Sequence, residues 1–583
     1  MGAALAGCAA DVGTTPYAHE SPGDAPEGLD DLRAIRGDRF LGGSGRDLIE
    51  DLDVTGDGDL LLAGGTSSTD FPTTDGSTLD TTAQTGCSAC PHDATITKLS
   101  ADGTSVRWSR VLGGPGFDRA TTIVFDSGLT FVAGSTGGGL PTTTGAGDRT
   151  FAGGSTPERG DEDGFVCRLD TATGAVDWCT YVGGAGPGGV TAIAFRGNVY
   201  VAFAVAAGAD LHLDADYAAA FAGGHRATQQ GADIVILSLA PQDGAFVSAT
   251  FAGGTGDEFG PASLVEDGSY FHVLAGTSST DVPVPNGLLT TAPPGTNLFF
   301  ATYAPGLTGL AYGTYLGGDG DEETTGNGLD GWTDGTQIVA VGGTTTSNDM
   351  PYRNGIHGRP VASGALGCGR GDVWFAVLQP DQAGSASLLY ASYLGGGEGE
   401  RFGGLHAIDS AFGRVVALTG STSSTTFPVN RGARTQWLGP TCSTLDGATE
   451  GFVAHVNTTV SRHAATFVGG SSYDRGTALL QRHVVGETSS ADLPTVTGGD
   501  DELGGTRDGF LIELGAPPPP PPGGGDGGPT DASEGFEHLP GDHVFPPDDD
   551  DGGCCGTAPV PVAPGTATLA GLVMLLVRRR RGR

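Results

Sequence analysis

Residues 310–318 read LAYGTYLGG and residues 388–396 read LLYASYLGG, and this aromatic-rich run ending in a Gly-Gly doublet decides the fold. A doublet of the same kind occurs seven times, at intervals of between 64 and 78 residues. Such regular spacing indicates seven copies of one structural unit rather than chance in a glycine-rich chain. The seven doublets begin at Gly42, Gly113, Gly183, Gly253, Gly317, Gly395 and Gly469.

Each copy carries the same ordered parts. A short apolar segment follows the doublet, and a second apolar run leads into a Ser/Thr-rich stretch that closes on proline, as in TSSTDFP at 66–72. After a variable loop, an acidic or amide residue opens a third apolar run, and a fourth run leads into the next doublet. Four β-rich runs separated by Gly, Asp and Ser turns predict a four-stranded antiparallel sheet. The third runs begin at Asp93, Asp163, Asp233, Asn297, Asp372, Glu450 and Asp508.

Seven such sheets predict an all-β fold, a seven-bladed β-propeller of four-stranded antiparallel blades over residues 36–515. The two ends of this region complement one another. The seventh copy stops after its third run at Gly515, and an extra run around 39–41 precedes the first doublet. We expect this N-terminal strand to complete the last blade and close the ring, which removes open sheet edges. The alternative, an open β-solenoid, would have a shorter period and no complementary ends.

The repeat unit also resembles a known family. Its pattern, YLGGxGxD…AGxTSSxDFP…DxFVxxL…YxTYLGG, is similar to the bacterial β-propeller repeat (SBBP) family of secreted and surface proteins. The resemblance covers about residues 36 to 515 and implies a fold and an extracytoplasmic setting, but no reaction. The third copy, with VAFAVAAGAD at 201–210, and the second, with GGGLP at 137–141, depart from the pattern.

Composition argues against one class of partner. The 583 residues carry 68 acidic and 29 basic side chains, for a formal net charge of −39. Proteins bind nucleic acids and anionic lipid headgroups through concentrated basic surfaces, so we do not expect DNA or RNA as a partner. Hydrophobic residues make up 38% of the chain, which is enough for the repeats to bury a core.

The N-terminal residues resemble a lipoprotein signal. Residues 5–8 read LAGC, which is similar to the lipobox in which a cysteine, here Cys8, receives lipid after signal cleavage. Only seven residues precede Cys8, which is too short for a working signal peptide, so we expect a translation start further upstream, with a chance match as the alternative. Residues 9–35 form an acidic stretch typical of a disordered tether.

The C-terminal residues indicate a second membrane-related segment. Residues 516–553 form a Pro/Gly/Asp-rich linker that contains no core-forming run. Cys554 and Cys555 follow, then an apolar stretch at 558–577 and the sequence RRRRGR. This arrangement resembles the myxobacterial C-terminal sorting tail, which implies processing at one of these cysteines and display on the cell surface. The alternative is an ordinary C-terminal anchor, and both place the propeller outside the cytoplasm.

Six cysteines lie within the repeats, and an even number in an exported domain favours disulfides. Cys167 and Cys179 fall on the third and fourth runs of one copy, symmetric about a turn, so we expect a cross-strand bridge. Cys368 and Cys442 occupy equivalent loops of neighbouring copies and form a candidate staple between blades. Cys87 and Cys90 form a CxxC, for which a loop disulfide is favoured over redox chemistry or half of a zinc site.

Metal and catalytic motifs are weak. Residues 42–47 read GGSGRD, like the calcium-binding unit of β-rolls, but such units would have to recur every nine residues. Isolated calcium sites at blade corners are a hypothesis, because carboxylates recur near the doublets and calcium prefers carboxylate oxygens. No HExxH, GxSxG, P-loop or dinucleotide motif stands in a suitable context, so we assign no catalytic, cofactor or metal residue. The recurring carboxylates are Asp47, Asp118, Asp257, Asp321 and Asp474.

Other acidic positions are interpreted as fold devices. The stretch DVTGDGD, with Asp53, Asp57 and Asp59, is the predicted turn between the first and second strands. The aspartate of the Ser/Thr stretch recurs in several copies, so we expect an Asx-type hydrogen bond that holds the turn before proline. Residues 352–370 and 430–450 are the richest unrepeated loops. The recurring aspartates are Asp70, Asp281, Asp349 and Asp492.

Three functions are compatible with this reading. The first is a non-enzymatic binding or adhesion module at the cell surface, which recognises an extracellular protein or polysaccharide through its second-to-third-strand loops. The second is a secreted polysaccharide- or protein-degrading enzyme that uses acidic residues in a central funnel. The third is a purely structural component of the envelope. Convergence of unrepeated Asp, Glu or His residues on one face would favour the enzyme.

Overall fold

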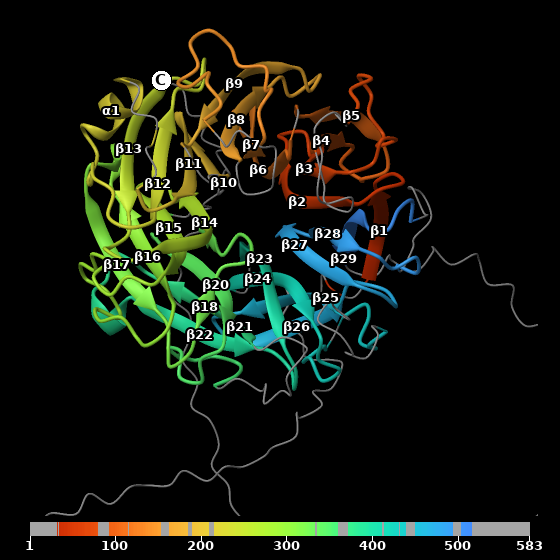
Figure 1. Cartoon of the computed structure of the whole chain (residues 1–583). Coiled ribbons are helices and arrows are strands. Elements are labelled where there is room, and N and C mark those ends of the chain that lie inside the picture. Colours follow the sequence, from red (N-terminus) through yellow and green to blue (C-terminus); the bar gives the residue numbers. More distant parts are fainter. Residues whose placement is uncertain are drawn as a thin grey trace, which may run out of the picture. The chain divides into compact units, whose positions relative to one another are not determined.

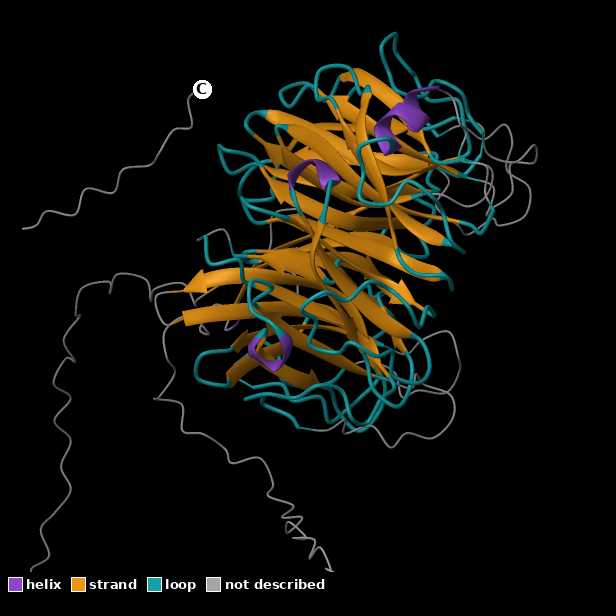
Figure 2. Ribbon diagram, turned by 90° about the vertical axis from the view of Figure 1, so that its left-hand side faces the viewer, coloured by secondary structure: helices purple, strands orange, loops and turns teal. Residues whose placement is uncertain are grey.

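The computed structural model contains seven separate antiparallel sheets arranged as the blades of a β-propeller (Figure 1). It describes residues 32, 34–79, 93–114, 116–152, 162–184, 189–208, 211, 215–332, 335–358, 371–410, 413–430, 432–438, 449–493 and 503–515. Strands dominate the described part, and the helices are short (Figure 2). The prediction of an all-β, seven-bladed propeller is therefore confirmed.

The first four blades follow one another along the chain. Blade 1 contains β2 (Asp47–Val54), β3 (Leu60–Thr66), β4 (Asp93–Leu99) and β5 (Val106–Leu112). Blade 2 contains β6 (Arg119–Asp126), β7 (Leu129–Thr136), β8 (Asp163–Leu169) and β9 (Val176–Val182). Blade 3 contains β10 (Val190–Arg196), β11 (Asn198–Val205), β12 (Asp233–Leu239) and β13 (Phe246–Ala252). Blade 4 contains β14 (Glu258–Glu266), β15 (Phe271–Thr277), β16 (Asn297–Tyr303) and β17 (Leu310–Leu316).

The remaining blades complete the ring. Blade 5 contains β18 (Glu322–Glu323), β19 (Leu329–Gly331), β20 (Val339–Thr345), β21 (Asp372–Leu378) and β22 (Leu388–Leu394). Blade 6 contains β23 (Glu400–Ser410), β24 (Gly413–Thr422), β25 (Glu450–Asn457) and β26 (Arg462–Phe467). Blade 7 contains β27 (Asp474–Leu480), β28 (His483–Thr488), β29 (Asp508–Gly515) and the N-terminal β1 (Ala34–Leu41).

The N-terminal strand closes the ring as the sequence predicts. β1 pairs antiparallel with β29, and Phe40 lies opposite Phe510 in that register. Both phenylalanine side chains are buried in one cluster with Leu32 and Val484. Burial of each phenylalanine side chain contributes about 1.5–3 kcal/mol to the free energy of folding. The pairing of β1 with β29 therefore supplies a substantial part of the stability of blade 7.

The core lies between the blades. The second and third strands, such as β3 and β4, are buried along their whole length, because neighbouring blades cover both of their faces. In one hydrophobic cluster, Phe131 of blade 2 packs with Val201 and Phe203 of blade 3. A propeller of this kind buries apolar surface only when its neighbours are present, so the ring folds as a unit.

Two blades differ from the repeat. In blade 5 the innermost strand is interrupted between β18 and β19, where Asn327 forms a bridge to Gly404 of blade 6 and a Cβ built on Gly326 would overlap the carbonyl of Gly403. In blade 3 the second-to-third-strand loop forms the short helix α1 (Ala215–Phe221), whose Tyr217 is fully buried. The third copy lacks the TSSxDxP signature, and the helix fills that position. Two 3₁₀ turns, η2 (Pro305–Leu307) and η3 (Gly384–Ala386), are the other described helices.

The described parts of the second-to-third-strand loops fold back onto the outer strand of their own blade. Isolated bridges join Leu289 to Tyr315, Arg353 to Ala391 and Asn430 to Ala465. An outer strand otherwise presents unpaired backbone groups, so these loops protect the blade edges. The long loops therefore serve the fold over part of their length.

Candidate functional site

The seven Gly-Gly doublets lie at one end of the blades, together with the starts of the second-to-third-strand loops, and we call this end the doublet face. At each regular corner the serine and aspartate side chains of the Ser/Thr stretch accept hydrogen bonds from backbone amides after the doublet. In blade 1, Asp70 Oδ1 accepts from Ser44 N at 2.8 Å and Ser68 Oγ accepts from Gly45 N at 2.8 Å. The serine and aspartate of the signature TSSxD thus act as acceptors for one tight turn, while its threonine hydroxyl donates to Asp47.

These contacts correct the expected Asx turn. Asp70, Asp281, Asp349 and Asp492 accept backbone hydrogen bonds from residues 21 to 30 positions away, beside the doublet. The aspartate is a fold device, as its repetition indicated, but it joins two distant segments instead of holding its own turn. The donors are the amides of Ser44, Thr255, Asp319 and Ser471.

A buried carboxylate stands at the start of the innermost strand in six of the seven blades. In blade 1, Asp47 Oδ2 accepts from Gly43 N at 2.8 Å, and its other oxygen accepts from Thr66 Oγ1. The same pair of donors, a doublet amide and a threonine hydroxyl, recurs at each equivalent acid. These acids are Asp47, Asp118, Glu258, Glu322, Glu400 and Asp474.

This set differs in three blades from the carboxylates proposed for calcium, because Glu400 was not among them and two of the proposed residues are displaced by one position. Glu258 and Glu322 occupy the buried position, whereas Asp257 and Asp321 accept hydrogen bonds from the amides of Ala232 and Thr296. Alignment by residue type failed here because an Asp precedes the Glu in both blades. Among the described residues, no group of three or more His, Cys, Asp or Glu side chains is arranged to hold a metal ion.

Each buried acid meets a second polar residue, the one that opens the third strand of the preceding blade. The first glycine of the doublet lies between them, since a Cβ built on Gly42 would be 2.7 Å from both Asp47 Oδ2 and Asp508 Oδ1. Burial raises the pKa of Glu258 to about 7, and the nearby Asp233 adds to this effect. Burial also raises the pKa of Glu400, and the adjacent Asp372 raises it further.

Some blade junctions carry a compensating group. Arg226 bonds to Asp233 beside Glu258, and Arg434 lies 2.6 Å from Glu450 beside Asp474. In blade 4 the third strand opens with Asn297, which removes one charge from its pair. A second buried carboxylate is energetically unfavourable unless it is protonated or paired with a positive group. The arginines and the asparagine therefore lower the electrostatic cost of placing two acidic positions side by side.

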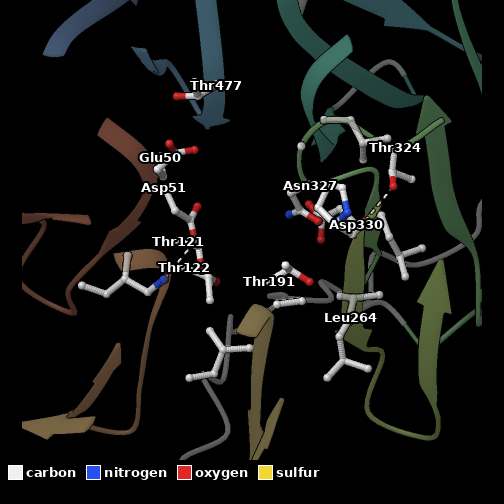
Figure 3. Close-up of a pocket in the computed structure, with 18 of the residues that line it drawn as sticks. Glu50, Asp51, Thr121, Thr122, Thr191, Leu264, Thr324, Asn327, Asp330 and Thr477 are labelled. Atoms are coloured by element: carbon white, nitrogen blue, oxygen red, sulfur yellow. Dashed lines mark hydrogen bonds between the residues drawn. The ribbon is translucent and has the colours of Figure 1, made fainter. Parts of the chain in front are cut away.

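The innermost strands enclose a central cavity of about 680 Å³. Its wall carries threonine and arginine side chains toward the doublet face, where the innermost strands begin, and a mixture of apolar and acidic side chains, such as Leu480, Asp53 and Glu266, toward the other end. Figure 3 shows Glu50 and Asp51 on one side of the cavity and Asn327 and Asp330 on the other. Unrepeated titratable residues do converge here, as the enzyme hypothesis requires.

Two aspartates of β2 hold the neighbouring blade. Asp51 Oδ2 accepts from Ile123 N at 3.0 Å and Asp53 Oδ2 accepts from Phe125 N at 2.6 Å. Burial raises the pKa of Asp51 to about 7 and that of Asp53 to about 6, against the effect of these hydrogen bonds. The predicted turn is confirmed for Asp57 and Asp59, which lie between β2 and β3, whereas Asp53 belongs to β2.

Asp330 links two adjacent blades in the same way on the other side of the cavity. Its Oδ2 accepts from His406 Nδ1 at 2.7 Å and from Ala407 N at 2.9 Å, both in β23 of the next blade. Threonines make similar links, since Thr191 donates to Ala262 O at 3.0 Å and Thr477 donates to Ile49 O at 2.6 Å. The polar side chains of the cavity wall therefore join adjacent blades.

The cavity residues were not predicted from the sequence. Asp330 and His406 are 76 positions apart, and neither belongs to the repeated pattern. The available signal was the position after each buried acid, where the repeat is broken by Arg119, Arg401 and Arg475. These arginines share one position of the repeat only when Glu258 and Glu322, rather than Asp257 and Asp321, are aligned with the buried acids of the other copies.

The predicted disulfide is present. Cys167 and Cys179 are directly opposite in the β8–β9 register and form a disulfide with a Cα–Cα distance of 4.1 Å. The remaining cysteines lie outside the described residues, as do residues 1–31 and 516–583 with the proposed lipid and processing sites. These cysteines are Cys8, Cys87, Cys90, Cys368, Cys442, Cys554 and Cys555. The expected tether at 9–35 is too long at its C-terminal end, because β1 begins at Ala34 and Leu32 is buried in the cluster of blade 7. In the part of the chain that is described, no helix has the length and apolarity to span a membrane.

Comparison with known proteins identifies only remote structural likeness. No family model and no curated protein matches the chain. The quinohemoprotein alcohol dehydrogenase of Comamonas testosteroni aligns over 87% of this chain and 78% of its own, with 11% identity and a TM-score of 0.37. The α-L-arabinanase of Penicillium chrysogenum aligns over 82% and 98%, with 10% identity and a TM-score of 0.33. Values this low carry no argument about function.

Proposed function

We propose that this protein is a non-enzymatic binding or adhesion module of the cell envelope, which presents its doublet face to an extracellular protein or polysaccharide. One observation carries the proposal. The aspartates that break the repeat in the cavity have oxygens engaged by backbone amides of the adjacent blade, as Asp51, Asp53 and Asp330 show. A carboxylate that holds two blades together is poorly placed to move a proton during catalysis.

The regular corners supply the other requirement of a binding module, which is a rigid support. The same hydrogen bonds recur at most corners of the doublet face, so loops of different sequence start from equivalent, fixed positions. Surface loops held by a stable scaffold are a common site of recognition. The proposed ligand contacts are the loop segments that do not fold back onto the outer strands.

The proposed location rests on the ends of the chain. The lipobox-like LAGC implies attachment of lipid at Cys8, and the sorting-like tail with Cys554 and Cys555 implies processing and display on the cell surface. Both place the propeller outside the cytoplasm. The disulfide between Cys167 and Cys179 is compatible with an oxidising compartment.

A secreted enzyme is the second candidate, and the raised pKa of Asp51, at about 7, together with the His406–Asp330 pair favours it. A direct test incubates the purified chain with immobilised polysaccharides and envelope proteins, and measures both retention and released products. The proposal predicts retention without products. Product release that is abolished in both Asp51→Asn and Asp330→Asn would show that the cavity is an active site.

A further inference from the structure

Three arginines occupy one position of the repeat. Arg119, Arg401 and Arg475 each follow the buried acid that begins the innermost strand, and all three line the central cavity. The equivalent residues of blades 1 and 4 are Leu48 and Phe259, so an arginine here is not required by the fold. Positions that depart from a structural repeat are where function can be added to a constant scaffold.

Arg401 and Arg475 lie around the same backbone segment of blade 5. Arg475 Nη2 donates to Thr325 O at 3.0 Å. Thr325 Oγ1 in turn donates to Phe402 O, which belongs to the residue after Arg401. Arg401 and Arg475 both line the cavity, and each stands at the doublet-side start of the innermost strand of its blade, in β23 and β27.

Neither arginine is paired with a carboxylate in the described part of the chain. Arg401 is exposed, and its side chain makes no hydrogen bond or ion pair with the described residues, while Arg475 Nε is buried with no acceptor among them. By contrast, Arg119 bonds to Glu50, and Arg196 lies 3.3 Å from Glu266. In a chain with 68 acidic and 29 basic side chains, two guanidinium groups without a carboxylate partner among the described residues are unusual at one opening.

The surroundings fit a small polar ligand. A volume of about 680 Å³ is within the usual range of small-molecule sites. The exposed Asn327 adds a carboxamide that can both donate and accept hydrogen bonds, as sugar hydroxyls require. The hydroxyls of Thr324 and Thr477 donate to Pro261 O and Ile49 O, so toward a ligand they serve as acceptors. The planar fork of arginine matches the two oxygens of a carboxylate.

We propose that the doublet-side end of the central cavity binds the carboxylate of an acidic sugar, with Arg401 and Arg475 as the anion-binding residues. This inference rests on the proposed function, because it assigns a ligand class to the same face. The strong negative charge of the whole chain repels long polyanions, so the ligand is a short uronate-bearing saccharide or a chain end. Glu323 lines the same opening and opposes an anion, which limits the affinity.

Titration calorimetry of the full chain with digalacturonate tests the site, with the neutral disaccharide lactose and with inorganic sulfate as comparison ligands. We expect digalacturonate to bind, lactose to bind at least about tenfold more weakly, and sulfate to bind no better than lactose. Arg401→Gln and Arg475→Gln should each weaken digalacturonate binding about tenfold or more, and Glu323→Gln should strengthen it. Arg482→Gln, an exposed arginine paired with Glu513 away from the cavity, is the matched control and should change nothing.

Thermal melts of the same samples establish that each variant is folded, and the exposed Arg401 remains informative if Arg475→Gln does not fold. Absence of digalacturonate binding at millimolar concentration, or binding that survives both arginine substitutions, would overturn the proposal. Sulfate binding as tight as digalacturonate would replace the sugar site by a general oxyanion site. Polymer retention measured on the same wild-type sample separates failure of this site from failure of the proposed binding function.

Discussion

The buried acids at the blade junctions make a specific prediction about pH, and Asp474 is the clearest case. Its oxygens accept from Thr488 Oγ1 at 2.6 Å, Gly470 N at 2.7 Å and Ser490 Oγ at 2.9 Å. Burial nevertheless raises its pKa from 3.8 to about 7, and Glu450 contributes to the same direction. The folded protein thus holds a proton at Asp474 that the unfolded chain releases.

The sign and size of the effect follow from this difference. Between pH 4 and pH 7 the folded state binds more protons at Asp474 than the unfolded state, so stability falls as the pH rises. The pKa difference corresponds to about 4 kcal/mol, at about 1.36 kcal/mol for each pH step. Asp474→Asn removes this dependence, at a cost of about 1–2 kcal/mol because the amide nitrogen cannot accept a hydrogen bond.

Urea unfolding of wild type and Asp474→Asn, followed by circular dichroism at several pH values, measures the difference. The variant should be less stable than wild type at pH 4 by about 1–2 kcal/mol, and more stable at pH 8 by about 2 kcal/mol. Parallel stability profiles for the two proteins would refute the assignment of a buried, protonated acid at this junction.

Asp492 provides a control of opposite sign in the same corner. Partial burial opposes ionisation there, but the backbone and hydroxyl hydrogen bonds from Ser471 outweigh it and lower the pKa. Its stabilising contribution is present at neutral pH and disappears as the pH falls through the lowered pKa. Asp492→Asn should therefore be destabilised at pH 7 and approach wild type in acid, the reverse of Asp474→Asn.

Three further predictions concern the ring itself. Gly395→Ala should lower the thermal unfolding temperature strongly or cause aggregation, because the new Cβ would overlap Asp372 Oδ1. Gly309→Ala is the control and should unfold at the wild-type temperature, because no atom outside the adjoining residues lies within 4 Å of its new Cβ. Reduction of the Cys167–Cys179 disulfide should lower the free energy of unfolding by about 2–3 kcal/mol in urea titrations, and a Cys167→Ser/Cys179→Ser variant should not respond to reductant. Deletion of Ala34–Leu41 should abolish the cooperative thermal transition and cause self-association in size-exclusion chromatography; an unchanged monomer with the wild-type transition would contradict ring closure by β1.

Most of the fold could be predicted because it is repeated. The same architecture is indicated independently by the seven doublets, by the seven residues that open the third strands and by the complementary ends of the repeat region. The Cys167–Cys179 bridge follows from strand register alone. The exceptions are local. The break in the innermost strand of blade 5 depends on contact between Gly326 and a neighbouring blade, and α1 fills a corner that lacks the usual signature.

The site could be predicted only in part. The recurring aspartates were correctly interpreted as structural, but their partners were not, because Asp70 bonds to a residue 26 positions earlier. The cavity wall depends on residues from separate blades, such as Asp330 and His406, and no local pattern places them together. Contacts between residues of different blades depend on how the blades pack together, and the repeated sequence pattern predicts only the contacts within one blade.

The measurement that tests the central claim most directly is protease shaving of intact cells that express the chain from its native upstream region, with mass spectrometry of released and retained peptides. A surface-displayed binding module predicts propeller peptides released from unbroken cells and a mature protein without the arginine-rich tail. Protection of the propeller until the envelope is broken would contradict surface display.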